Sequence, residues 1–274
     1  MNIAGALLFG RNELLKAGVE SPALESRLLL SYLTGLSHSA LIIHDDELLD
    51  EALLQRFKEL LKKRATGYPV EYILEQKEFW GLKLKVTPDT LIPRADTETL
   101  VEQALNTDFS SVLDLGTGSG AVILAIKKER PKAQCFACDL NEGALEVAKF
   151  NAANLGLLVE FSKSSWFEAY KGRSFDLIVS NPPYIEDGDE HLKHSSLPFE
   201  PLCALTSGKD GLDDIRIIIK GAREHLNKHG ILMLEHGYNQ AFEVRKLLSE
   251  NGFVNVGTVR DLGGNERVSF GTCF

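Results

Sequence analysis

The chain has 274 residues, enough to bury the core of one domain with a smaller one beside it. Apolar residues make up 44% and charged residues 25%, which is typical of a globular protein. The net charge of −9 argues against gripping a long stretch of nucleic acid, because such binding needs many Lys and Arg residues. No run approaches the roughly 18 apolar residues of a membrane span. The first 15 residues lack a cationic start followed by a sustained apolar stretch, so we expect no signal peptide and a cytoplasmic location.

Residues 1–72 are expected to form a small helical domain. Ser21 is placed to cap a helix that starts at Pro22, and Gly35 ends its apolar pattern. A second amphipathic helix fits residues 47–67, with cations at its C-terminal end, where the helix dipole favours them. Residues 73–93 then alternate apolar and polar side chains around a Pro-Asp turn, which predicts a linking β-hairpin.

Residues 94–274 alternate strands with helices, which predicts an α/β domain built on a mainly parallel sheet covered on both faces. A closing hairpin with a turn at 262–265 implies at least one antiparallel edge strand. Cys135 and Cys138 form a C-x-x-C, but its apolar surroundings indicate a buried strand and not a metal or redox pair. The expected strands are 111–116, 133–140, 174–180 and 230–237, and the expected helices are 121–130, 141–156, 210–226 and 238–252.

A glycine-rich turn, Asp114–Gly120, joins the first of these strands to its helix. Open α/β sheets bind ligands at this edge, and glycines let the backbone approach a bound molecule closely. Asp139 ends the next strand, where doubly wound folds place an acid on ribose hydroxyls. The loop predicts a nucleotide or S-adenosylmethionine site, and by itself does not choose between NAD and S-adenosylmethionine.

Asn181-Pro182-Pro183-Tyr184 follows the third strand, so it lies at the same edge of the sheet. The two prolines fix the backbone and remove two N–H donors. The Asn181 side-chain carbonyl and the Pro182 backbone carbonyl can then both accept protons from an NH₂ group. This segment favours amide or amino nitrogen chemistry over an oxidoreductase.

Together with the glycine loop, this segment resembles the amino-methyltransferases, which act on adenine N6, guanine N2 and glutamine amides. Further segments that carry a resemblance are Phe79–Gly81, Leu91–Glu98, Phe199–Pro201 and Asn265–Arg267. With them the chain resembles, over essentially its whole length, one branch: the bacterial protein-(glutamine-N5) methyltransferases of the PrmC/HemK family. One departure is Ala95, where the family usually has proline, and we expect it to change stability slightly without loss of function.

The resemblance implies a Rossmann-like class I methyltransferase fold, with a mainly parallel seven-stranded sheet, an antiparallel terminal hairpin strand and an N-terminal helical bundle. It implies S-adenosylmethionine as cofactor, with the ribose on Asp139 and the adenine near Trp166, and no metal. Arg94 and Glu98 would order the domain junction and the cofactor pocket. The remaining cofactor-binding residues are expected to be Gly116, Thr117, Gly118, Ser119, Gly120 and Asn181.

The implied substrates are class I peptide chain release factors, bound partly by the N-terminal domain and methylated on the glutamine of their Gly-Gly-Gln motif. This glutamine would lie against Asn181, Pro182, Pro183 and Tyr184. Asn181 and Pro182 would accept its two amide protons, and Tyr184 would pack against the flat amide. The nitrogen loses a proton only after transfer, so no strong base is needed.

Four other functions share some of these features. A glutamine methyltransferase of a ribosomal protein shares the loop and Asn181–Tyr184, and residues 94–97 favour release factors over it. An adenine-N6 nucleic-acid methyltransferase would have to flip a base and grip phosphates, which the acidic charge disfavours. The G-x-G-x-G spacing together with Asn181–Tyr184 counts against an NAD-dependent oxidoreductase. A non-enzymatic S-adenosylmethionine-binding module would keep the loop but has no need for Asn181.

Overall fold

The computed structural model describes all 274 residues, which form two compact units. The first contains 1–76 together with 194–199, and the second contains 77–193 and 200–274. The sequence pattern gave no sign that 194–199 belongs with the N-terminal residues. None of the helices has the length and apolar content needed to span a bilayer.

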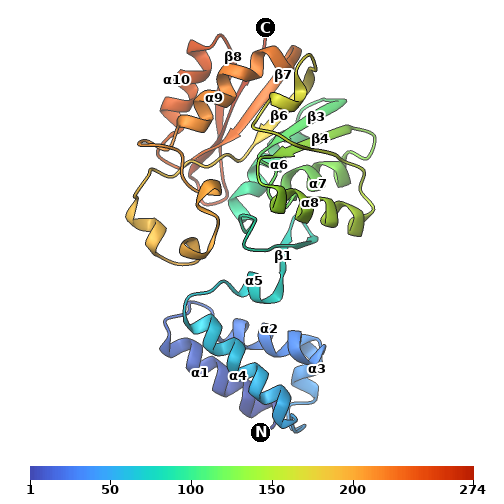
Figure 1. Cartoon of the computed structure of the whole chain (residues 1–274), viewed down its shortest axis with the longest axis vertical. Coiled ribbons are helices and arrows are strands. Elements are labelled where there is room, and N and C mark those ends of the chain that lie inside the picture. The colour runs from blue at the N-terminus through green and yellow to red at the C-terminus, as the bar shows by residue number, and fades with distance from the viewer. The chain divides into compact units, whose positions relative to one another are not determined.

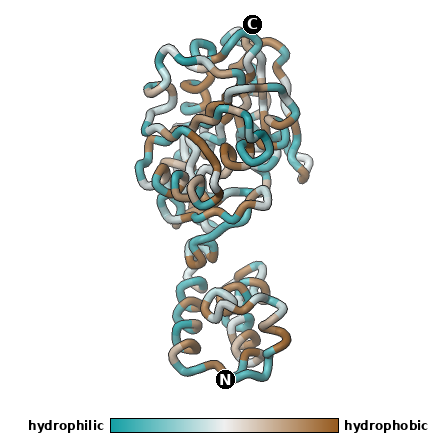
Figure 2. Tube along the Cα trace, turned by 90° about the vertical axis from the view of Figure 1, so that its right-hand side faces the viewer, coloured by the Kyte–Doolittle hydropathy of each residue, from teal (hydrophilic) through white to brown (hydrophobic).

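The N-terminal unit is helical (Figure 1). Gly35 ends the second helix with a φ of 71°, as predicted, whereas Ser21 stands at the cap position without making a side-chain capping hydrogen bond. Apolar and polar residues alternate along these helices (Figure 2), and the apolar sides, including Leu29 and Phe57, form a separate buried core. The helices are α1 (Ile3–Lys16), α2 (Pro22–Thr34), α3 (His38–Ile43), α4 (Glu51–Ala65) and α5 (Val70–Leu74).

A short hairpin follows, made of β1 (Gln76–Phe79) and β2 (Leu82–Lys85). The predicted Pro-Asp turn was the wrong one: the chain reverses at Trp80 and Gly81, whose φ angles are 51° and 63°. A positive φ at both central residues matches the twist of a two-residue hairpin loop. The Trp80 backbone N–H also donates to Glu98 Oε1 (2.8 Å), a tertiary contact that local turn preferences cannot reveal.

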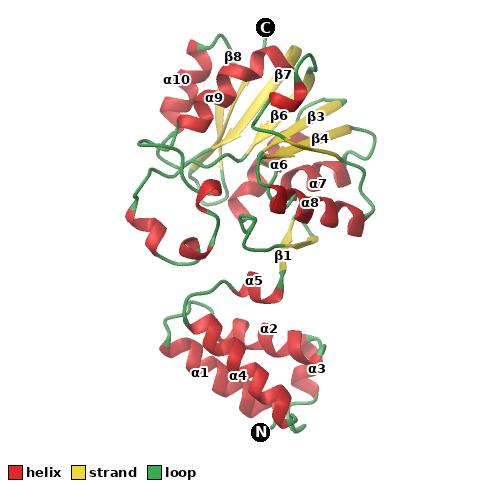
Figure 3. Ribbon diagram, viewed as in Figure 1, coloured by secondary structure: helices red, strands yellow, loops and turns green.

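The second unit contains a seven-stranded sheet, whose strands are yellow in Figure 3. The strand order is β5-β4-β3-β6-β7-β9-β8, and β9 runs antiparallel to both of its neighbours. The predicted closing hairpin with antiparallel pairing is confirmed. The strand that runs against all the others, β9, lies one place in from the edge, and its hairpin partner β8 forms the edge. Val268 and Ser269 of β9 are fully buried, whereas β8 is only partly covered. The strands are β3 (Ser111–Leu115), β4 (Gln134–Asp139), β5 (Glu160–Lys163), β6 (Phe175–Ser180), β7 (Leu226–Glu235), β8 (Val254–Arg260) and β9 (Glu266–Thr272).

Helices cover both faces of this sheet. Because side chains alternate along a strand, Val112 packs with α6 and α7 on one face while Leu113 packs with α9 and α10 on the other. The Cys135 and Cys138 thiols are buried in β4, and burial raises their pKa values to about 11 and about 12. The helices are α6 (Glu98–Leu105), α7 (Ala121–Glu129), α8 (Glu142–Leu155), α9 (Asp213–Ala222) and α10 (Ala241–Glu250), with a 3₁₀ turn at Ala95–Thr97 before α6.

The four neighbouring parallel strands β4, β3, β6 and β7 end at one edge of the sheet. Their last residues are Asp139, Leu115, Ser180 and Glu235. The Ser180 hydroxyl donates to the Leu115 carbonyl (2.6 Å), which ties the end of β6 to the start of the glycine-rich turn. This edge therefore brings the segments singled out in the sequence together.

Candidate active site

The turn after β3 requires its glycines. Gly116, Gly118 and Gly120 have φ angles of 71°, 55° and 84°, a region that side chains with a Cβ rarely adopt. The backbone N–H groups of Gly116 and Thr117 both donate to the Cys138 carbonyl (2.9 Å each), which anchors the turn to β4. A Cβ at Gly118 would meet no atom within 4 Å, so this residue faces open space.

The Asp114 side chain stabilises the turn by a hydrogen bond to Thr117. Its side chain is 1% exposed and accepts a hydrogen bond from the Thr117 hydroxyl (2.7 Å). Burial raises the pKa of this carboxyl to about 7, and the Thr117 hydrogen bond opposes that rise. Asp114 is thus a structural support for the loop, enclosed away from solvent.

Asp139 lies beside the same turn at the end of β4. Its Oδ2 accepts from the Gly118 backbone N–H and its Oδ1 from the Asn141 N–H, both at 2.9 Å. Burial raises the pKa of this carboxyl, and these two hydrogen bonds limit the effect. A carboxylate offers about four acceptor positions, so Asp139 can hold the turn and still receive hydroxyl donors.

Trp166 follows β5 with a φ of 48°, which is strained for a large side chain. Its carbonyl accepts hydrogen bonds from the Cys138 thiol (3.3 Å) and the Ser164 hydroxyl (3.0 Å), and these hold the backbone in place. A Cβ built at Gly116 would stand 3.5 Å from the indole ring, so the ring packs directly against the glycine turn.

Asn181 is the first residue after β6. Its Nδ2 donates to the hydroxyl oxygen of Thr97 (3.1 Å), which leaves the side-chain oxygen as the free acceptor of the amide. The Tyr184 side chain points toward Glu235: its hydroxyl lies 3.4 Å from Oε1 of that buried residue. The Tyr184 backbone carbonyl accepts from Gln240 Nε2 (2.9 Å).

Two arginines form ion pairs that stabilise the surrounding segments. Arg94 pairs with Glu200, whose other carboxylate oxygen accepts from the Ile92 backbone N–H (3.0 Å). Arg267 bridges Asp261 (3.0 Å) and Asp96 (3.1 Å), which connects β9 to the turn before α6. These contacts join segments that lie far apart in the sequence.

The segments enclose a cavity of about 660 Å³. Of the residues expected at the site, Gly120, Pro182 and Tyr184 do not line it. Gly120 begins α7 instead, where a Cβ would stand 3.0 Å from Leu124. The expected residues that do line the cavity are Gly116, Thr117, Gly118, Ser119, Asp139, Trp166, Asn181 and Pro183.

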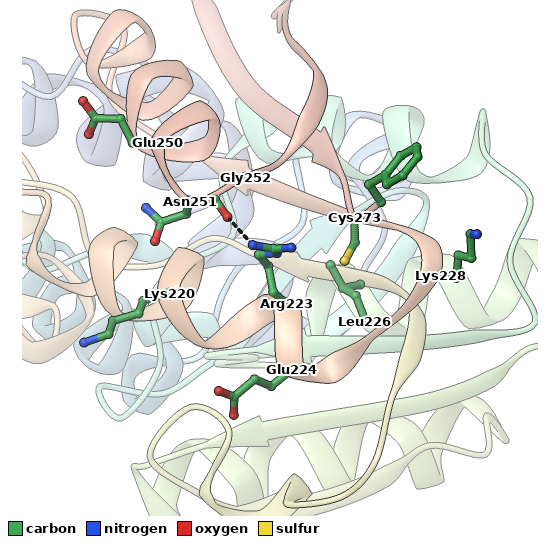
Figure 4. Close-up of a pocket in the computed structure, with 10 residues that line it drawn as sticks. Lys220, Arg223, Glu224, Leu226, Lys228, Glu250, Asn251, Gly252 and Cys273 are labelled. Atoms are coloured by element: carbon green, nitrogen blue, oxygen red, sulfur yellow. Dashed lines mark hydrogen bonds between the residues drawn. The ribbon is translucent and has the colours of Figure 1, made fainter.

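A second hollow, of about 850 Å³, lies at the opposite end of the sheet, where β7 begins (Figure 4). Arg223 in this hollow is already engaged with the Asn251 carbonyl (3.2 Å). Lysine and glutamate side chains around it are solvent-exposed, and the last residues of the parallel strands β4, β3, β6 and β7 do not line it. The first cavity is therefore the candidate active site.

The chain matches two family models: the PrmC N-terminal domain over residues 5–74 and the methyltransferase small domain over residues 95–196. It is 44% identical to the release factor glutamine methyltransferase of Shewanella oneidensis, over 94% of this chain and 91% of that one. It is 48% identical to the protein of that name from Xylella fastidiosa, over 91% and 92% of the two chains. The chain belongs to the release factor glutamine methyltransferase family. A methyltransferase structure from Pyrococcus furiosus shares the fold, with a TM-score of 0.56 and 17% identity. The match covers 80% of this chain and 98% of that one.

The cavity fits the cofactor of a methyltransferase of this family. Gly118 offers open space where a bound molecule can approach the backbone, Asp139 offers carboxylate oxygens, and Trp166 offers an aromatic face. No phosphate-binding group such as a lysine or arginine lines the cavity, which suits a nucleoside with an amino-acid end. S-adenosylmethionine has that chemistry.

Sequence reasoning missed two residues of this site. Thr97 lines the cavity and accepts a hydrogen bond from Asn181, and Glu235 is buried beside Thr97. The signal for Thr97 was its place in the segment 94–98. The signal for Glu235 was an acid that ends the apolar strand β7 at the ligand-binding edge of the sheet.

Proposed function

We propose that this enzyme transfers a methyl group from S-adenosylmethionine to the side-chain amide nitrogen (N5) of glutamine in the Gly-Gly-Gln motif of class I peptide chain release factors. The observation that carries the proposal is the pairing of the glycine turn with Asn181 in one cavity. Family membership at 44–48% identity over more than nine-tenths of the chain supports the substrate.

The amide nitrogen of the acceptor is a poor nucleophile, because its lone pair is delocalised into the carbonyl. When bound, the cofactor supplies an activated methyl on a sulfonium. The protein has to present the nitrogen in one orientation, and orientation of this kind contributes on the order of 7–11 kcal/mol in favourable cases. In this scheme the Asn181 side-chain oxygen, which lines the cavity, accepts one amide proton. The Pro182 carbonyl is assigned the other, although Pro182 itself is buried and does not line the cavity.

These two acceptors also stabilise the positive charge that develops on the nitrogen as the new bond forms. Preorganised dipoles aimed at a developing charge are a main source of catalysis in enclosed sites. Pro182 is buried and fixed between Asn181 and Pro183, so its carbonyl direction is set before the substrate arrives. Tyr184 contributes by holding the segment through its contacts with Glu235 and Gln240.

The test replaces Asn181 by Ala and measures cofactor binding and methyl transfer to a class I release factor. We expect a cofactor Kd within about threefold of the parent and a loss of kcat of at least a hundredfold, about 2.7 kcal/mol. A kcat within threefold of the parent would refute the role of Asn181. A cofactor Kd that rises as much as kcat falls would place Asn181 in cofactor binding instead.

A further inference from the structure

A buried hydrogen-bonded group lies behind Asn181. Ser180 and Leu234 are the last paired residues of β6 and β7, so Asn181 and Glu235 come next on the two strands. Thr97, 3% exposed, accepts the Asn181 Nδ2 proton (3.1 Å), and its hydroxyl is close enough to the Glu235 carboxyl to lower the pKa of that group. Glu235 is 1% exposed, and its Oε2 has no hydrogen-bond partner.

The direction of these hydrogen bonds decides which atom of Asn181 faces the cavity. A threonine hydroxyl has one proton to donate, and an ionised carboxylate can only accept. When Glu235 is ionised, the Thr97 proton points to it, and the Thr97 oxygen is left to accept from the Asn181 NH₂. The Asn181 oxygen then faces the cavity. With a protonated Glu235 as donor, Thr97 could donate to Asn181 and turn its NH₂ toward the substrate.

We propose that Thr97 and Glu235 are positioning residues, which orient the Asn181 amide so that its oxygen faces the glutamine nitrogen. This inference rests on the proposed role of Asn181 as an acceptor of the substrate's amide protons. The opposite orientation of Asn181 would place donor against donor and block productive binding. Thr97 and Glu235 therefore act on turnover through Asn181.

The charge state of Glu235 changes near neutral pH. Burial raises the pKa of this carboxyl from 4.5 to about 7, while the hydrogen bonds from Thr97 and Tyr184 and the charge of Arg267 lower it. The productive orientation requires the ionised form, so kcat should rise as pH increases through about 7. The other charged or titratable groups around Glu235 are Arg267, Tyr184, Asp96 and, in the chain segment after β7, His236.

The first experiment is a double-mutant cycle in the full-length enzyme with a class I release factor as substrate. Thr97→Val keeps the shape and removes the hydroxyl, and it should lower kcat at least tenfold, about 1.4 kcal/mol. Thr97→Ser should restore kcat to within threefold of the parent. In an Asn181→Ala background, Thr97→Val should change kcat by less than twofold, because the group that it orients is gone.

Thr107→Val is the matched control, because the Thr107 hydroxyl donates to the Ala104 carbonyl (2.8 Å) at the end of α6, outside the cavity. It should leave kcat unchanged. Equal losses from Thr97→Val in the parent and Asn181→Ala backgrounds would overturn the inference, because they would show a role independent of Asn181. An inactive Asn181→Ala beside a fully active Thr97→Val would overturn it too, and would leave the proposed function standing.

The second experiment measures kcat from pH 6 to pH 8 in the parent and in Glu235→Gln. The parent should show a rise with an apparent pKa near 7, and Glu235→Gln should be slower at pH 8 and flat across the range. A rise that persists in Glu235→Gln would assign the titration to another group, such as Asp114, and contradict the inference. Absence of any methyl transfer by the parent would contradict the proposed function itself.

Discussion

Gly118 offers the sharpest test of where the cofactor lies. It has a φ of 55°, and a Cβ there would enter open space on the wall of the 660 Å³ cavity. Gly172 is a matched control: its φ is 75°, a Cβ there also meets nothing within 4 Å, and it does not line the cavity. Replacing either glycine by Ala therefore imposes the same backbone strain, and only one places a methyl group where the cofactor is expected.

The strain of a left-handed conformation is about 1–2 kcal/mol for a residue with a Cβ. Both variants should lose a similar amount of stability, roughly 2–8 °C in Tm for a protein of this size. Cofactor affinity should separate them. Gly118→Ala should raise the Kd for S-adenosylmethionine at least tenfold, about 1.4 kcal/mol, and Gly172→Ala should leave it within twofold.

The assay is isothermal titration calorimetry with S-adenosylmethionine and, separately, with the demethylated product. Measuring binding and not turnover keeps the result independent of the protein substrate. A Kd for Gly118→Ala that matches the Kd for Gly172→Ala would refute the placement of the cofactor against the glycine turn.

Three further perturbations test other parts of the site. Burial raises the Asp114 pKa from 3.8 to about 7, so the folded protein holds a proton that the unfolded chain releases between about pH 4 and pH 7. The contribution of Asp114 to the parent's free energy of unfolding therefore falls as pH rises through that window, and Asp114→Asn lacks this titration. The free energy of unfolding of Asp114→Asn minus that of the parent, measured by urea unfolding, should grow as pH rises from about 4 to about 7. A difference that stays constant with pH would contradict this. Gly211→Ala would place a Cβ 2.2 Å from the Tyr184 carbonyl oxygen and should lower kcat at least tenfold, whereas Gly188→Ala, with a positive φ but open space, should not. Trp166→Ala should raise the Kd for S-adenosylmethionine at least tenfold, measured by calorimetry. Trp80→Ala, which changes the other tryptophan, outside the cavity, should leave this Kd unaltered.

The parts of the fold that were predicted from sequence are those with strong local signals. The turn Asp114–Gly120 lies between an apolar strand and a helix and contains glycines that adopt positive φ. These local signals predict its position in the chain and its conformation. The helix predicted over 141–156 is found as α8, and Asn141 caps it by accepting from the Gly143 N–H (2.9 Å). By contrast, β5 has four residues and no continuous apolar run, and it was not predicted.

The parts that were missed depend on long-range contacts. The hairpin turn at Trp80 is held by Glu98, and the hydroxyl of Thr97 meets Asn181, 84 positions away in the chain. Nothing in local periodicity brings such residues together, because strand order and register decide their distance. Glu235 likewise gains its environment only when β7 inserts between β6 and β9.

The transfer of a methyl group to a release factor glutamine can be measured directly. The most direct measurement is to incubate the purified enzyme with S-adenosylmethionine and a class I release factor, and to sequence the Gly-Gly-Gln peptide by mass spectrometry. One added methyl on the glutamine side chain, absent with Asn181→Ala, is the predicted result. An unmodified glutamine, with cofactor binding intact, would contradict the claim and direct the search to a ribosomal protein or a nucleic acid as the acceptor.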